Sequence, residues 1–101
     1  MISVLASILI HEGQRAAFLE IFHANVPKVR QEVGCIEYYP AIDIDAGLPV
    51  QRFEENTVTV VEKWQSLEAL KAHLATPHML DYKEKVKTLV KDISLKVLQE
   101  A

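Results

Sequence analysis

Four segments of the chain have the alternation or the aliphatic composition of β-strands. Residues 2–10 are apolar on both faces, which is typical of a strand that is covered on two sides. Residues 35–43 are a second candidate, with Pro40 at an edge or a bulge. Residues 57–64 alternate most clearly, and a last strand is predicted over about residues 92–99. The clearest turn signal, Asp45-Ala46-Gly47-Leu48-Pro49, lies between the second and third strands.

Apolar residues at intervals of three and four predict a helix over residues 14–33. Its main stripe consists of Phe18, Phe22, Asn25 and Val29. Because Pro27 lacks an N–H group and has a fixed φ, we expect it to kink the helix or to restart it near Asn25. Gly34 stands where the C′ residue of this helix is expected.

Two shorter helices are predicted in the second half of the chain. Ser66 is a suitable N-cap for a helix that ends before Thr76 and Pro77. A second helical segment over residues 79–90 carries an apolar stripe of Met79, Tyr82, Val86 and Leu89. The order of elements is therefore strand, helix, strand, strand, one or two helices, strand.

This order is that of the ferredoxin-like α+β plan, a four-stranded antiparallel sheet with helices on one face. At 101 residues, the chain has room for one such domain, over residues 1–101. Apolar side chains on the face without helices need a partner, and a second copy of the same sheet is the simplest one. We therefore expect a homodimer.

Composition and charge exclude several classes of partner. Half of the residues are hydrophobic and the net charge is −3, which argues against disorder and against a polyphosphate-binding surface. No apolar run reaches the ~18 residues that a membrane span needs, and we see no secretory signal. The single cysteine, Cys35, cannot form an internal disulfide. We expect a cytoplasmic protein that binds neither nucleic acid nor membrane.

The most informative candidate for chemistry is Glu62, which alternation places on one strand face with Val58, Val60 and Trp64. Either its carboxylate reaches solvent or a basic partner at the strand end, or it lines a cavity. In a cavity, desolvation would raise its pKa and suit it to proton abstraction. Trp64, the only tryptophan, is either a core residue or a wall for a planar ligand.

Three further residues also have two interpretations each. His73 is either a packed, hydrogen-bonded histidine or a base. Asn25 either caps the chain after the proline or donates to a substrate oxygen. Tyr38 and Tyr39 point to opposite faces of the sheet, so only one of them can line a given cavity.

The sequence carries no signature of a bound metal or nucleotide. His73 and His78 are five residues apart with Pro77 between them, which is not the spacing of two ligands on one helical face. Glycine-rich phosphate loops, a Gly-x-Ser-x-Gly elbow and a Cys-x-x-Cys pair are absent. We expect no metal site.

Two runs of residues resemble the antibiotic biosynthesis monooxygenase family. The first is Asn25-Val-Pro-Lys-Val-Arg-Gln-Glu-Val-Gly34-Cys35-Ile-Glu-Tyr38. The second is Glu62-Lys-Trp64-Gln-Ser66-Leu-Glu-Ala-Leu70-Lys-Ala-His73, followed by Thr76-Pro77-His78. The similarity covers nearly the whole chain. It implies a ferredoxin-like fold and a homodimer whose two sheets pack into an α/β-barrel.

The resemblance also implies an activity, because members of this family include cofactor-independent monooxygenases that oxidise quinols or phenols. It implies a small aromatic substrate and O₂ as partners, and no cofactor. Haem-degrading members differ, since Ser7 and His73 stand where that branch has Asn and Trp, and Lys83 falls near the position of its His. In this interpretation Glu62 or His73 takes the phenolic proton and Asn25 binds the second oxygen. The residues expected to contact the substrate are Trp64, Tyr38, His78, Phe22 and Tyr82.

Two other functions stay open at this point. A non-catalytic dimeric module that binds a small aromatic ligand fits as well, because every candidate residue also has a structural role. An isomerase of a small keto-sugar phosphate, as in a related branch of the family, would need a basic pocket. Only three arginines, Arg15, Arg30 and Arg52, are present to supply one.

Overall fold

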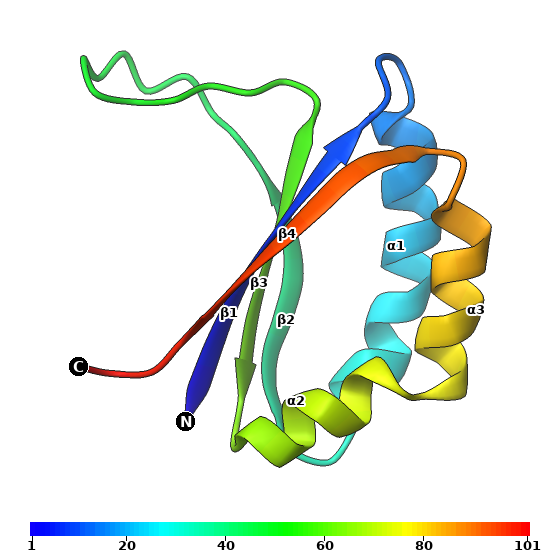
Figure 1. The fold of residues 1–101 in the computed structure, drawn as a ribbon. Coiled ribbons are helices and arrows are strands. Elements are labelled where there is room, and N and C mark those ends of the chain that lie inside the picture. The colour runs from blue at the N-terminus through cyan, green and yellow to red at the C-terminus, as the bar shows by residue number, and fades with distance from the viewer.

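The chain folds into one antiparallel sheet with its helices on a single face (Figure 1). The elements are β1 (Ile2–Ile10), α1 (Arg15–Arg30), β2 (Cys35–Ile42), β3 (Thr57–Trp64), α2 (Leu67–Leu74), α3 (Pro77–Val86) and β4 (Val90–Leu98). This computed structural model describes residues 1–101. The strand order is β2-β3-β1-β4, and all neighbouring strands are antiparallel. The predicted ferredoxin-like fold is confirmed.

Alternation along the two central strands decides which side chains meet the helices. In β1, the even-numbered residues from Val4 to Ile10 are buried, whereas Leu5 and Leu9 on the other face keep 37% and 36% of their surface exposed. In β3, the buried residues Val60 and Glu62 lie opposite Ala6 and Val4. The helix-facing side therefore carries the core, and the other side is left half exposed in the single chain.

Helix α1 supplies the aromatic part of the core. Phe18 and Phe22 are fully buried, with ring centroids 5.8 Å apart. The helix is continuous from Arg15 to Arg30 with Pro27 inside it, so the predicted restart near Asn25 is wrong. Asn25 is a buried residue within the helix and does not cap it, because the surrounding stripe packs onto the sheet and holds the helix together through the proline.

The turn that follows α1 is also different from the prediction. The helix ends three residues early, since Val33 is 91% exposed and has nothing to pack against. Gly34 is therefore not the C′ residue. It has a φ of +87° in the turn before β2, where an added Cβ atom would lie 2.6 Å from the Cβ atom of Ala69. This glycine lets α2 pack closely against the turn.

Both short helices begin at a hydroxyl N-cap, of which the sequence predicted Ser66; Thr76, predicted only to end the preceding helix, caps α3, which begins at Pro77 rather than at residue 79. Ser66 Oγ accepts from the backbone N–H of Ala69 at 3.1 Å, and Thr76 Oγ1 accepts from that of Met79 at 3.3 Å. Pro77 begins α3 as well as ending α2, because a first-turn proline loses no helical hydrogen bond. Helix α3 ends at Val86, and β4 begins at Val90, two residues before the predicted strand start.

A long connection, residues 43–56, joins β2 to β3. It extends away from the sheet on the side opposite the helices (Figure 1). Its apolar side chains are exposed, and they are Ile44, Leu48, Val50 and Phe53. None of the three helices has the length and hydropathy that a bilayer-spanning segment requires.

Candidate functional site

A cavity of about 620 Å³ lies between the helix-facing side of the sheet and the helices α2 and α3. Twelve of its sixteen lining residues are hydrophobic, and the four others are Glu62, His73, Lys83 and Lys87. Ile93 and Leu95 of β4 are about half exposed and also line the cavity, so it is open to solvent beside this edge strand. A mostly apolar cavity of this size with a small number of polar groups is typical of a small-molecule site.

His73 is held rigidly at the end of α2. Its backbone carbonyl accepts a hydrogen bond from Thr76 Oγ1 at 2.9 Å. Its ring is 1% exposed and lies against the indole of Trp64, with centroids 4.6 Å apart. The edge of the ring also meets Tyr38 at a centroid distance of 5.5 Å. These contacts leave the imidazole a single orientation.

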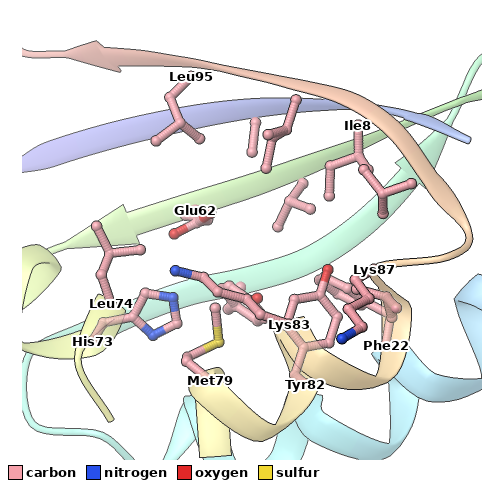
Figure 2. Close-up of a pocket in the computed structure, with 16 residues that line it drawn as sticks. Ile8, Phe22, Glu62, His73, Leu74, Met79, Tyr82, Lys83, Lys87 and Leu95 are labelled. Carbon is pink, nitrogen blue, oxygen red and sulfur yellow. The ribbon is translucent and has the colours of Figure 1, made fainter.

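Glu32, in the turn after α1, fixes which nitrogen of His73 carries the proton. Its carboxylate oxygen lies 2.9 Å from His73 Nδ1 and 2.7 Å from His78 Nε2. Because an ionised carboxylate can only accept, Nδ1 of His73 is the donor in this pair. The other ring nitrogen, Nε2, is on the side of Glu62 and Lys83 (Figure 2). His73 therefore presents an acceptor to the cavity.

Burial keeps His73 neutral. Desolvation lowers the pKa of His73, and it outweighs the opposite effects of the hydrogen bond and the charge of Glu32. The nearby charges of His78 and Lys83 lower this pKa further. A neutral imidazole with Nδ1 protonated and Nε2 free is the form that a general base requires.

Glu62 lies on the neighbouring wall, on the same face of β3 as Val60 and Trp64, as alternation predicted; of the two alternatives left open for its carboxyl group, the structure has the one in the cavity. Its Oε1 accepts a hydrogen bond of 3.0 Å from Trp64 Nε1. Burial raises the pKa of Glu62 to about 7, although the bond from Trp64 acts in the opposite direction and the charge of Glu32 adds to the rise. At neutral pH this carboxyl group can both accept and donate a proton.

Aromatic rings form the floor of the cavity. Phe22 stacks on Tyr38 with centroids 5.4 Å apart and planes 11° apart, and it meets Tyr82 edge-on at 5.7 Å. Burial raises the pKa values of Tyr38 and Tyr82, so both phenols stay protonated at neutral pH. Phe22, Tyr38 and Tyr82 thus lie on the cavity wall together with Glu62 and His73.

Three of the candidate residues do not line the cavity. Trp64 is fully buried behind the ring of His73 and reaches the cavity only through its bond to Glu62. Asn25 Nδ2 donates to Met79 Sδ at 3.4 Å, between α1 and α3. His78 is turned toward Glu32. No three His, Cys, Asp or Glu side chains are grouped so as to hold a metal ion.

Two residues of the site were not predicted from the sequence to belong to it. Glu32 is separated from its partners His73 and His78 by 41 and 46 residues, so no local pattern marks it. Lys83 lies on the helical face between the apolar positions of α3, where an exposed lysine is expected, yet it lines the cavity. Both are visible only once α2 and α3 are placed on the sheet.

Comparison with known proteins agrees with this fold. Residues 1–85 match the sequence family described as antibiotic biosynthesis monooxygenase. The chain belongs to this family. The matched part includes Glu32, Glu62, His73 and Lys83. It does not include β4, whose residues line the cavity where it opens to solvent.

The chain is similar to individual proteins of known sequence and to solved structures. The chain is 40% identical over 101 residues to the Escherichia coli protein named "Probable quinol monooxygenase YgiN", and the match covers 98% of this chain and 97% of that one. A solved structure from Shewanella oneidensis is 28% identical, has a TM-score of 0.81, and covers 96% of this chain and 87% of its own. A Pseudomonas aeruginosa structure at 23% identity has a TM-score of 0.82 with 99% and 93% covered, which shows the same fold.

Because the pKa of Glu62 is raised in the folded state, the free energy of unfolding should depend on pH. Its folded-state pKa of about 7 is above its ordinary value of 4.5, so its favourable contribution is complete below pH 4.5 and is lost as the pH rises through 7. Between pH 5 and pH 8, the wild type should lose about 2 kcal/mol more free energy of unfolding than Glu62→Gln. Urea denaturation at both pH values measures this difference.

The matched control is Glu20→Gln, at an exposed position of α1 away from the sheet, which should follow the wild-type pH dependence. Equal pH dependence in the wild type and in Glu62→Gln would show that Glu62 is not desolvated.

Proposed function

We propose that this protein is a cofactor-independent monooxygenase that oxidises a small quinol or a related phenol with O₂. One observation carries the proposal: two proton acceptors, Glu62 and His73 Nε2, lie at one end of a cavity in which twelve of the sixteen lining residues are hydrophobic. Membership of the family and the name of the E. coli relative support the same class of reaction.

The reaction needs no electron source other than the substrate. A deprotonated quinol is electron-rich enough to transfer an electron to O₂, and the resulting semiquinone and superoxide combine to form a C–O bond at a ring carbon. Loss of water leaves a hydroxyquinone. The balance is one quinol and one O₂ giving one hydroxyquinone and one water, with one oxygen atom in each product.

In this proposal His73 takes the phenolic proton at Nε2, and Glu32 is a positioning residue that holds Nδ1–H. Glu62, with its pKa of about 7, exchanges the second proton. Asn25 and His78, which the sequence suggested as direct contacts, support the site from behind through Met79 and Glu32.

The walls of the cavity supply the remaining requirement, a dry slot for a flat molecule. The substrate-contacting residues we propose are Phe22, Tyr38, Met79 and Tyr82, all of which line the cavity. Low water content near the ring favours electron transfer to O₂ by limiting competing protonation of the phenolate. Trp64 contributes by keeping His73 and Glu62 in place.

The test is oxygen consumption by protein freed of metal and flavin, with benzo- and naphthohydroquinones as substrates. We expect the wild type to exceed the uncatalysed rate. His73→Asn keeps an amide donor toward Glu32 but removes the acceptor at Nε2, and it should reduce kcat/KM by about 10²-fold or more. Circular dichroism would verify that this variant is folded.

The matched control is His23→Asn, an exposed histidine of α1, which should retain full activity. Oxygen uptake by the wild type no faster than the uncatalysed rate would favour the non-catalytic binding module. An active His73→Asn variant would remove His73 from the role of base.

We also propose that two copies of the chain associate through the face of the sheet without helices. This face carries half-exposed apolar side chains from three strands, including Leu5, Tyr39 and Leu98. The side chains lie on a continuous sheet, and the connection 43–56 extends beyond the same face (Figure 1). Monomeric proteins rarely leave such a face uncovered.

Light scattering coupled to gel filtration tests this association. The wild type should have twice the 11.4 kDa mass of the chain. Leu5→Glu places a charge at the centre of the face and should give monomers, whereas Val33→Glu, at an exposed position after α1, should not. A monomeric wild type, or a dimer that survives Leu5→Glu, would contradict the proposed interface.

A further inference from the structure

Lys83 is the one lysine of α3 that lines the cavity without forming an ion pair. Lys85 pairs with Asp81 at 2.9 Å, and Lys87, which also lines the cavity, is held by Glu84 at 2.6 Å. The amine of Lys83 instead points across the cavity toward Glu62 and His73 (Figure 2). Its charge is close enough to lower the pKa of His73.

An ammonium group in this position has few partners in the empty cavity. Apart from Lys83 itself, the lining residues that are not hydrophobic are Glu62, His73 and Lys87, and of these His73 offers a single nitrogen lone pair. Because the pKa of Glu62 is raised to about 7, its carboxyl group is uncharged in about half of the molecules at pH 7. The end of the cavity that holds Lys83 is therefore suited to receive a negative charge from a ligand.

We propose that Lys83 binds an acidic substituent, a carboxylate, on the aromatic ring of the substrate. This inference rests on the proposed function and narrows its substrate class to quinols or phenols that carry an acid group. The amine lies at the same end of the cavity as His73 and Glu62, so the carboxylate sits next to the hydroxyl group that reacts. The rest of the ring then extends along the apolar walls.

The size of the cavity is compatible with such a ligand. About 620 Å³ accommodates two fused rings with two small polar substituents, and small-molecule sites commonly span 300–1,000 Å³. A charge-assisted hydrogen bond from Lys83 would distinguish the acid from a neutral ligand of the same shape. Hydrophobic walls alone could not make that distinction.

Isothermal titration calorimetry with three ligands tests the proposal without turnover. The ligands are 1-hydroxy-2-naphthoate, its neutral carboxamide, and 6-hydroxy-2-naphthoate, in which the acid is remote from the hydroxyl. The wild type should bind the first about tenfold more tightly than either of the others. Lys83→Gln should abolish this preference while leaving the affinity for the carboxamide within twofold.

Lys85→Gln is the matched control, since Lys85 lies on the same helix outside the cavity, and it should keep the preference. Equal affinity of the wild type for acid and amide would overturn the inference. The same conclusion follows if Lys83→Gln weakens both ligands alike, if Lys85→Gln has the same effect as Lys83→Gln, or if none of the ligands binds.

Oxygen uptake separates this inference from the proposed function. Turnover of a neutral hydroquinone without any preference for the acid would overturn the role of Lys83 and leave the monooxygenase in place. A Lys83-dependent preference for the acid, with no oxygen consumed, would support the anion site and reject the monooxygenase.

Discussion

The hydrogen bonds of Glu32 to two histidines are the interaction on which the site depends. They connect the turn after α1 to the end of α2 and the start of α3, which lie 41 and 46 residues further along the chain. The contacts continue from there. The ring of His73, which bonds to Glu32, lies against the indole of Trp64, and the indole N–H donates a hydrogen bond to Glu62. The two groups that face the cavity are therefore fixed by one connected set of contacts rather than by separate ones.

Desolvation acts on the two groups in opposite directions, and the result suits acid–base chemistry. It lowers the pKa of the imidazole of His73 and raises that of the carboxyl group of Glu62 to about 7, so near pH 7 the imidazole is neutral and the carboxyl group is neutral in about half of the molecules. A pair of this kind can move protons without placing a permanent charge in an apolar hollow. Of the two lysines that line the hollow, Lys87 is paired with Glu84, whereas Lys83 forms no ion pair and its flexible stem reaches in from the exposed side of α3.

The sequence was sufficient for the fold and for half of the site. Period-two alternation identified β3 and placed Glu62 on one face with Val58, Val60 and Trp64, the Ser66 cap located α2, and apolar periodicity located α3. It could not show that Trp64 lies behind His73 or that Asn25 bonds to Met79, because these contacts depend on how helices pack on the sheet. Glu32 was missed for the same reason: its partners are 41 and 46 residues away. The end of α1 was placed too late because Val33 fitted the apolar period but has no neighbour to pack against.

The most direct test of this account is the protonation state of His73, measured by two-dimensional ¹⁵N–¹H NMR of the imidazole at pH 7. We predict a neutral ring with the proton on Nδ1 and an unprotonated Nε2, and a loss of this single tautomer in Glu32→Gln. A ring that carries its proton on Nε2, or one that is doubly protonated at this pH, would have no acceptor facing the cavity and would contradict the account.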